Sequence, residues 1–238
     1  MRTTPGLDDA FDRAAGRYDL MTRLNPGYHR HLRAAAGVLA ERLGGRGELT
    51  LVDLGCGSGS STAGLVEALP GARVVGVDAS EGMLDQARTK AWPAGVEFVH
   101  ATAETLPGLA LPPAQGVLAA YLFRNVPAGG RDDGLGMVRE QLEPGGWLVV
   151  QEYSVAGRRR AGIVWSLVCW LVVVPLAFVL RARPGLYVYL WRSVRGFDGT
   201  DAFSARLAAA GFTDLVRLEV DGWQRGILHT WVARRPGS

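Results

Sequence analysis

The stretch that decides the fold reads Leu51-Val52-Asp53-Leu54-Gly55-Cys56-Gly57-Ser58-Gly59. Its apolar first half predicts a buried strand that ends near Asp53. Three alternating glycines follow, and they let the chain turn sharply into a helix from Ser60, because glycine has no Cβ to hinder the turn or an approaching ligand. A strand, a glycine-rich turn and a helix in this order indicate an α/β fold with a ligand site at the turn.

The segment from Leu49 to Tyr153 repeats this alternation of strand and helix. Strands are predicted at Thr50–Leu54, Arg73–Asp78, Val96–His100, Gly116–Ala120 and Trp147–Tyr153. Helices are predicted at Ser60–Leu69, Ser80–Thr89 and Arg131–Leu142, each beginning near a residue that can cap a helix. Strands that alternate with helices form a parallel sheet with helices on both faces.

The C-terminal part adds a helix at Asp201–Ala210, followed by Gly211, and two strands, Thr213–Val220 and Gly226–Ala233, joined by a tight turn at Asp221-Gly222. We therefore expect an α/β, Rossmann-like fold with a seven-stranded, mostly parallel sheet, an antiparallel last strand, and helices on both faces. Residues 1–238 are expected to form one domain, with an N-terminal helical cap at 1–47 and an apolar insert at 155–200 that faces substrate or membrane.

Composition excludes several classes of protein. The chain has 238 residues, of which 48% are hydrophobic, so it can bury a sizeable core and is not disordered. Two cysteines, Cys56 and Cys169, cannot form a disulfide framework, and the N-terminus lacks the apolar core of a secretory signal, so a cytoplasmic location is expected. The net charge of +3 comes from scattered arginines rather than a basic stripe, and the four histidines lack ligand spacing; neither a nucleic-acid partner nor a metal is expected.

The insert contains Ile163–Leu180, an apolar segment interrupted only by Ser166, Cys169 and Pro175. As a helix it would span roughly 27 Å, just short of a bilayer core of about 30 Å. A span would separate the last two strands from their sheet, and arginines flank both ends, so no charge asymmetry orients a crossing. A core helix and a cap that faces lipid substrate or membrane both remain open; the arginines are compatible with peripheral contact at the inner membrane face.

A second carboxylate, Asp78, ends the next predicted strand, 25 residues after Asp53. In doubly wound sheets such an acid binds the ribose hydroxyls of a nucleotide. The dinucleotide fingerprint requires glycine where this chain has Ser60. The pattern D-x-G-x-G-x-G instead resembles motif I of class I S-adenosylmethionine (SAM) methyltransferases. This resemblance implies their fold and SAM as cofactor, with a ligand-free turn and an NAD site as the alternatives.

The cofactor is expected along the carboxyl ends of the first four strands. The acids would suit the cationic amino-acid end and the ribose of SAM, and the residues after the third strand would contact adenine, as they usually do in the superfamily. The predicted cofactor-binding residues are Asp53, Gly55, Gly57, Ser58, Gly59, Asp78, Ala79, Met83, Thr102, Ala103, Glu104, Ala120 and Tyr121.

Further motifs resemble the ubiquinone/menaquinone C-methyltransferase family over most of the chain. Phe11–Met21 resembles its F-D-x-(V/I)-A-x-x-Y-D-x-M segment, and Asp78–Leu84 matches its D-x-(N/S)-x-x-M-L. Phe123-Arg124-Asn125-Val126 matches L-R-N-V, which is the most specific element. Gln151–Ser154 parallels L-E-F-S, and Tyr189–Val194 parallels Y-x-Y-L-x-x-S-I.

This resemblance implies a SAM-dependent methyltransferase that acts on a carbon of a prenylated, demethylmenaquinol-like ring or another lipidic ring. Arg124 and Asn125 would lie near the methyl group, with Tyr18 folding over them. A guanidinium stays protonated, so Arg124 is expected to stabilise a developing phenolate rather than to remove its proton. O- or N-methylation of another small hydrophobic metabolite, and SAM or lipid binding without turnover, are the alternatives; a homodimer is also open.

Overall fold

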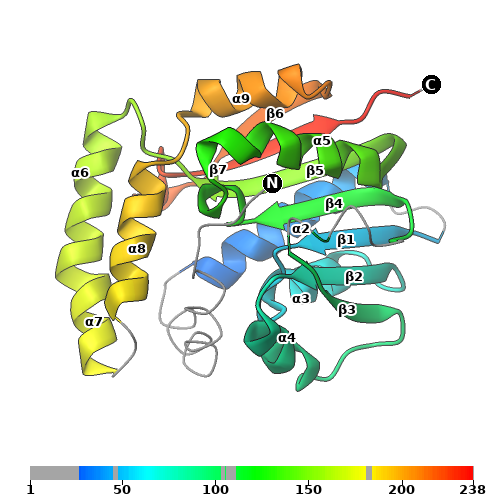
Figure 1. Ribbon diagram of the computed structural model, residues 1–238, viewed down its shortest axis with the longest axis horizontal. Coiled ribbons are helices and arrows are strands. Elements are labelled where there is room, and N and C mark those ends of the chain that lie inside the picture. Colours follow the sequence, from blue (N-terminus) through cyan, green and yellow to red (C-terminus); the bar gives the residue numbers. More distant parts are fainter. Residues whose placement is uncertain (1–26, 45–47, 103–104, 106–110, 181–183, 238) are drawn as a thin grey trace.

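The computed structural model describes residues 27–44, 48–102, 105, 111–180 and 184–237. Within these residues, seven strands form one sheet in the order β3-β2-β1-β4-β5-β7-β6 (Figure 1). Strands β1 to β5 run parallel, and β7 lies antiparallel between β5 and β6, which confirms the predicted fold class. The strands are β1 Thr50–Leu54, β2 Arg73–Asp78, β3 Val96–His100, β4 Ala114–Ala120, β5 Leu142–Tyr153, β6 Thr213–Glu219 and β7 Leu228–Arg234.

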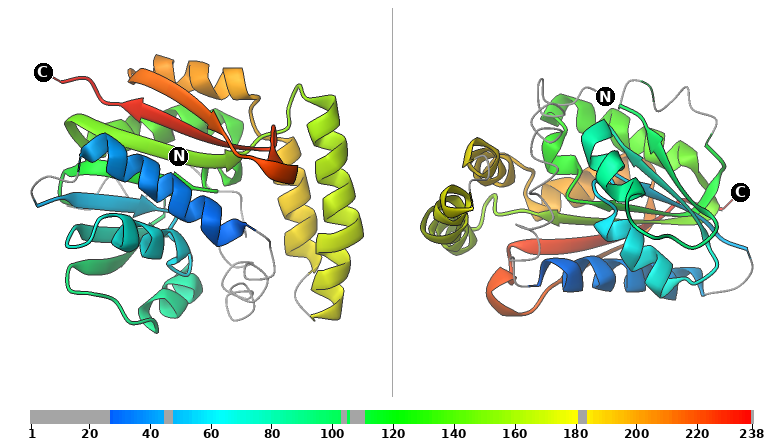
Figure 2. Two further views of the ribbon diagram at one scale, coloured as in Figure 1. Left: turned by 180° about the vertical axis from the view of Figure 1, so that it is seen from behind. Right: turned by 90° about the horizontal axis from the view of Figure 1, so that it is seen from below.

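Helices cover both faces of the sheet, because successive strand residues point to opposite sides. In β4, Val117 and Ala119 face a core shared with α5 and α9, whereas Leu118 faces a core shared with α2 and α3. Figure 2 shows α2 and α5 on opposite sides of the sheet. The helices are α2 Tyr28–Leu43, α3 Ser60–Ala68, α4 Glu81–Arg88, α5 Arg131–Gln141, α6 Arg159–Val168, α7 Val174–Val179, α8 Pro184–Arg195 and α9 Thr200–Ala209.

Several strand ends differ from the prediction, and two of the differences change the path of the chain. The strand predicted at Trp147–Tyr153 begins earlier, at Leu142, so Pro144-Gly145-Gly146 lies inside β5, whose pairing with β4 shifts register between Ala114 and Gly116. Gly145 has a φ of 84°, so the strand accommodates the irregularity as a bulge instead of ending. The connection from β6 to β7 is longer than the predicted tight turn and contains a 3-10 turn at Gly222–Gln224.

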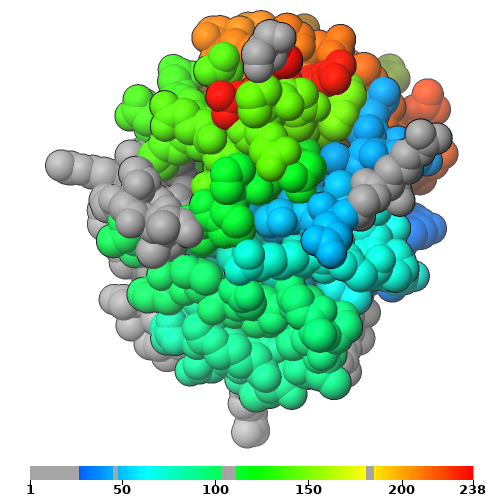
Figure 3. Space-filling view, turned by 90° about the vertical axis from the view of Figure 1, so that its right-hand side faces the viewer, coloured from blue at the N-terminus to red at the C-terminus, as the bar shows by residue number. Residues whose placement is uncertain are grey.

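Residues 159–180 and 184–195 form the two helical arms of a hairpin beside the carboxyl ends of the parallel strands (Figure 1). Its first arm runs through α6, a π-turn at Cys169–Val173, and α7. Pro175 lacks an N–H and would clash with a carbonyl of the preceding helical turn, so a widened turn accommodates it. A space-filling view from the opposite end shows residues of the α9 region at the top of the molecule and residues of the β2–β3 region at the bottom (Figure 3).

The π-turn also keeps the buried face of this arm aligned. Trp165, Cys169, Val174 and Ala177 are its buried residues, and the step from Cys169 to Val174 is five residues, not four. The Val174 N–H donates to the Cys169 carbonyl, the i to i+5 bond of a π-turn, so both halves present the same face to the protein. We name this arm, Arg159–Val179, the apolar arm.

The rest of the apolar arm faces outward. Leu171 is 70% exposed, Phe178 66% and Val179 77%, and Ile163, Val164, Leu167, Trp170 and Val172 are exposed as well. The core-helix interpretation of Ile163–Leu180 is therefore wrong for this structure, because only a narrow face is covered. Within the described residues, Arg159–Val179 is the one helix that could cross a membrane by length and composition.

Candidate active site

The three glycines after β1 form a corner whose backbone only glycine adopts readily. Gly55, Gly57 and Gly59 have φ values of 75°, 53° and 88°. The Gly55 and Cys56 N–H groups donate to the Val77 carbonyl, which fixes the corner to the end of β2. A Cβ at Gly59 would lie 2.8 Å from the Trp92 ring, and one at Gly57 would lie 3.1 Å from Met83 Cε. We call Gly55–Gly59 the glycine corner.

Asp53 lies fully buried beneath the glycine corner. Its Oδ2 accepts hydrogen bonds from Ser61 Oγ at 2.8 Å and Thr62 Oγ1 at 2.6 Å, while its Oδ1 has no hydrogen-bond partner among the residues that the structure describes. Burial raises the pKa of Asp53 to about 6, although the two hydroxyls and their hydrogen bonds favour the charged form. A buried acceptor without such a partner indicates a place for a further donor.

Asp78 connects the tip of β2 to the same corner. Its Oδ2 accepts a hydrogen bond from the Gly57 N–H at 2.7 Å, and its Oδ1 accepts one from the Ser80 N–H at 2.9 Å. Ser80 in turn caps α4, because its Oγ accepts the Met83 N–H at 3.2 Å. The carboxylate thus holds the glycine corner against the start of α4.

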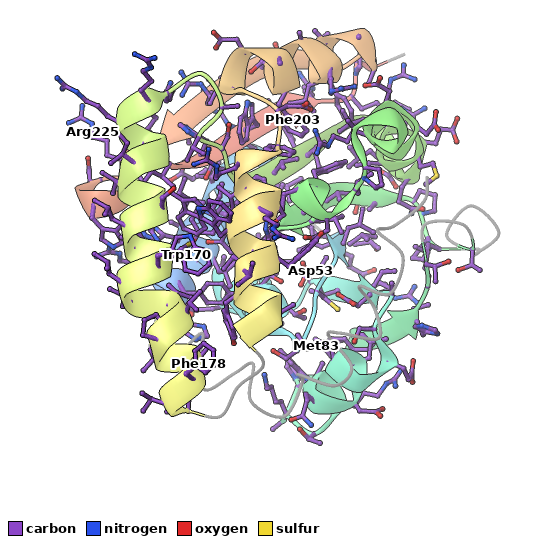
Figure 4. The ribbon with its side chains drawn as sticks, turned by 60° about the vertical axis from the view of Figure 1, so that its left-hand side comes forward. Asp53, Met83, Trp170, Phe178, Phe203 and Arg225 are labelled. Carbon is purple, nitrogen blue, oxygen red and sulfur yellow. The ribbon has the colours of Figure 1, made fainter. Side chains whose placement is uncertain are left out.

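The other predicted cofactor residues are only partly brought together. Ser58 is buried within the corner, and Met83, labelled in Figure 4, is buried beside it. Ala79 and Thr102 lie at the ends of β2 and β3, where His100 Nε2 is 3.0 Å from the Ala79 carbonyl. Ala120 and Tyr121 lie at the end of β4, on the other side of β1. Tyr18, Ala103 and Glu104 fall outside the described residues.

The site occupies the point where the sheet order reverses. β2 and β4 flank β1, and ligands of doubly wound sheets bind at such a switch point, outside the carboxyl ends of the strands. Asp53 Oδ1, which has no hydrogen-bond partner among the described residues, suits the cationic amino group of SAM. The residues present therefore fit SAM, with Asp53 and Asp78 as the acids that would hold it.

Arg124 and Asn125 form a 3-10 turn, Phe123–Asn125, just after β4. Both side chains donate to the Tyr121 carbonyl: Arg124 through Nη1, and Asn125 through Nδ2 at 3.2 Å. Leu122 joins this turn to the glycine corner, because its side chain packs over the face of Gly55 where a Cβ would point. The predicted catalytic pair and the predicted cofactor corner are therefore neighbours.

Tyr121 adopts a φ of 58°, which is rare for a residue other than glycine. Its ring stacks on Tyr28 of α2 and on Tyr153 of β5, with centroid distances of 5.4 and 5.0 Å, and Tyr153 stacks on Trp165 of the apolar arm. Burial raises the pKa of Tyr121 well above its usual range. This aromatic column holds the strained residue whose carbonyl binds Arg124 and Asn125.

The sequence did not predict a role for two residues that contact this turn, Glu152 and Tyr189. Glu152 is buried at the end of β5, 3.4 Å from Arg124 Nη1, and Tyr189 of α8 donates from its hydroxyl to Asn125 Oδ1 at 3.3 Å. Glu152 lies in the segment that parallels L-E-F-S, and Tyr189 in the one that parallels Y-x-Y-L-x-x-S-I. For Glu152, the signal in the sequence was a charged residue within a predicted buried strand. Among the described residues, no cluster of His, Cys, Asp and Glu has the makings of a metal site.

The chain is also similar in sequence to known methyltransferases. Residues 3–231 match the ubiE/COQ5 methyltransferase family. The chain belongs to this family. A demethylmenaquinone methyltransferase of Thermus thermophilus is 35% identical over 216 residues, which are 88% of this chain and 93% of the relative. A ubiquinone/menaquinone biosynthesis C-methyltransferase of Geobacter sulfurreducens is 33% identical, over 87% of this chain and 81% of the relative.

Solved structures of SAM methyltransferases share the fold. Human N-acetylserotonin methyltransferase in complex with SAM superposes with a TM-score of 0.65 at 18% identity, covering 99% of this chain and 61% of that one. A SAM-dependent methyltransferase from Aquifex aeolicus gives 0.61 at 16% identity, over 91% of this chain and 97% of that one. The family and the fold together make this protein a SAM-dependent methyltransferase.

Proposed function

We propose that this methyltransferase transfers the methyl group of SAM to a ring carbon of a prenylated hydroquinone or a closely similar lipidic ring. The observation that carries the proposal is the contact between the glycine corner and the Arg124–Asn125 turn through Leu122. The names of the relatives, which refer to demethylmenaquinone and ubiquinone, support this class of acceptor. We also propose that residues 1–238 work as one domain, in which 1–47 cap the site.

SAM supplies a methyl group on a positively charged sulfur, which an electron-rich carbon can displace. The protein has to hold the two reactants in line and favour the phenolate that makes the ring electron-rich. Arg124 is suited to the second task, since its guanidinium remains charged at the end of β4. In this proposal Tyr18 or a water molecule takes the phenolic proton, Asn125 orients the acceptor, and Asp53 and Asp78 hold the cofactor.

Arg124→Ala tests this division of roles. We expect the affinity for SAM to stay within about threefold of wild type, because the cofactor residues lie on the glycine corner, while turnover falls at least a hundredfold, about 2.7 kcal/mol in the barrier. Calorimetry with SAM and transfer of a labelled methyl group to a panel of hydroquinones measure both quantities. Methylation confined to an O or N acceptor would favour the alternative activity, and tight SAM binding without transfer would favour a non-catalytic binder.

The same proposal places the protein in the cytoplasm, in contact with the membrane surface through Ile163–Leu180. The exposed side of the apolar arm presents large apolar side chains, and the exposed Arg159, Arg160, Arg192 and Arg195 gather at one end of the hairpin. Trp170, labelled in Figure 4, is partly exposed, and its ring packs edge-on against that of Trp191 with a centroid distance of 5.6 Å. A helix with these features lies in the interface, its arginines reaching lipid phosphates.

Sedimentation with lipid vesicles tests the contact. Leu171→Glu combined with Phe178→Glu introduces charge on the exposed side of the apolar arm, and Leu215→Glu with Leu218→Glu makes the same change on β6, where both leucines are 38% exposed. We expect the wild type and the β6 variant to pellet with phosphatidylglycerol–phosphatidylethanolamine vesicles, and the arm variant to stay in solution. Equal pelleting of all three would contradict the proposal, and a dimer lost only in the arm variant would assign the surface to a second copy.

A further inference from the structure

Glu152 is a carboxylate in the interior of the protein with no exposed surface. Its Oε2 accepts a hydrogen bond from the Arg124 backbone N–H at 3.2 Å, and its Oε1 accepts one from the Tyr153 N–H at 2.9 Å and lies 3.4 Å from Arg124 Nη1. One carboxylate therefore contacts both the backbone and the side chain of Arg124.

Burial raises the pKa of Glu152, while Arg124 and the two backbone N–H groups lower it. Removing a carboxylate and a guanidinium from water is costly, and a buried ion pair does not in general stabilise a fold more than an apolar pair would. The fold therefore gains little stability from this pair. What the pair does provide is orientation, because the guanidinium is planar and rigid, so a contact that holds one of its nitrogens also restricts the directions of its other N–H groups.

Arg124 is fixed at the same nitrogen from a second side. Its Nη1 also donates to the carbonyl of Tyr121, the residue with the strained backbone. Glu152 lies in β5, and Tyr121 directly follows the neighbouring strand β4 and stays bonded to β5, since the Tyr121 N–H donates to the Gln151 carbonyl at 2.8 Å. The guanidinium is thus held between two acceptors that the sheet itself keeps in register.

We propose that Glu152 is the positioning residue of the methyl-transfer site: it aims the Arg124 guanidinium at the acceptor oxygen and carries out no proton transfer itself. This inference rests on the proposed function of Arg124. Since the carboxylate is not exposed and, among the described residues, contacts the site through Arg124, its effect on turnover should vanish when Arg124 is absent. A residue that acted on the acceptor independently would lack this dependence.

A double-mutant cycle tests the proposal, with Glu152→Gln, Arg124→Ala and the combined variant. We expect Glu152→Gln to lower kcat at least tenfold, with the KM for acceptor and the Kd for SAM within about threefold of wild type, and to change kcat less than twofold in the Arg124→Ala background. Glu152→Asp, which keeps the charge, should recover part of the loss. Asp198→Asn removes a second ion pair with a buried arginine, 2.8 Å from Arg131, and should leave kcat within twofold.

A direct readout comes from the NMR signal of the Arg124 side-chain N–H, identified by its loss in Arg124→Ala. Rotation about the guanidinium Cζ–Nε bond should be slow in wild type and at least several times faster in Glu152→Gln. Unchanged kcat and rotation in a folded Glu152→Gln variant, or an equal loss of kcat in both backgrounds, would overturn the proposal. Slow rotation in a wild type that binds SAM but methylates no hydroquinone would overturn the proposed function and leave the positioning contact standing.

Discussion

The glycine corner and the apolar arm lie at the same end of the sheet, yet their sequences constrain structure in different ways. In the corner, each residue type has a stereochemical reason: three glycines at positive φ, an acid at each strand tip, and a serine that caps α4. In the apolar arm, the residues share only their hydrophobicity. That property calls for burial but does not say by what, and the structure leaves most of the arm exposed.

Apolar residues of the core and of the apolar arm play different parts, although the amino-acid composition cannot distinguish them. Leu118 in β4 has no exposed surface and packs against α2 and α3, whereas Leu171 in the apolar arm is 70% exposed. Burial within the chain contributes to folding, while exposed apolar surface of this size contributes to binding something else.

The largest effect we expect is the contrast between Leu118→Ala and Leu171→Ala. The first leaves a cavity in the core and should lower the free energy of unfolding by about 2–5 kcal/mol. The second should change it by less than about 0.5 kcal/mol in lipid-free solution. Urea denaturation of both variants measures the contrast, and a cost above about 2 kcal/mol for Leu171→Ala would show that the arm is covered in solution.

Asp53 should give the protein a pH-dependent stability. Its native pKa, about 6, lies above the ordinary value of 3.8, so the native state binds the proton more tightly than the unfolded state does. The stabilisation is complete below about pH 4 and is lost as the pH rises through 6, a total of up to about 3 kcal/mol.

Asp53→Asn should remove this loss. In urea denaturation of the SAM-free protein, the free energy of unfolding should then depend less steeply on pH between 4 and 7 than in the wild type. Asp133→Asn, at an exposed position on α5, is the matched control and should keep the slope of the wild type. An unchanged slope in Asp53→Asn would mean that the corner does not bury the charge.

A smaller effect is expected from alanine at two glycines with nearly the same backbone. Gly59 has a φ of 88° and Gly71 a φ of 86°, but a Cβ at Gly71 would meet nothing within 4 Å. Both substitutions should cost about 1–2 kcal/mol of stability from the left-handed backbone. Only Gly59→Ala, which would push into Trp92, should also weaken SAM binding, at least tenfold by calorimetry. Equal affinities would show that the corner tolerates the displacement.

The sequence predicted those parts of the site that lie on one strand end and the turn after it. The first three strands begin and end at the predicted residues, and the helix caps at Ser80 and Gly211 are confirmed, because local stereochemistry dictates them. Glu152 was missed because it meets Arg124 across two strands, 28 residues apart. The bulge in β5 and the outward face of the apolar arm also depend on tertiary pairing, which no local pattern records.

The acids and glycines at the switch point are expected to bind SAM, and a substitution of Asp78 probes this binding without touching the acceptor side. Asp78 bonds the Gly57 and Ser80 N–H groups and ends β2, whereas Asp85 is an exposed acid on the following helix. Calorimetry should show that Asp78→Ala abolishes SAM binding, and that Asp85→Ala binds within about twofold of wild type. A folded Asp78→Ala variant that binds SAM as the wild type does would contradict the account.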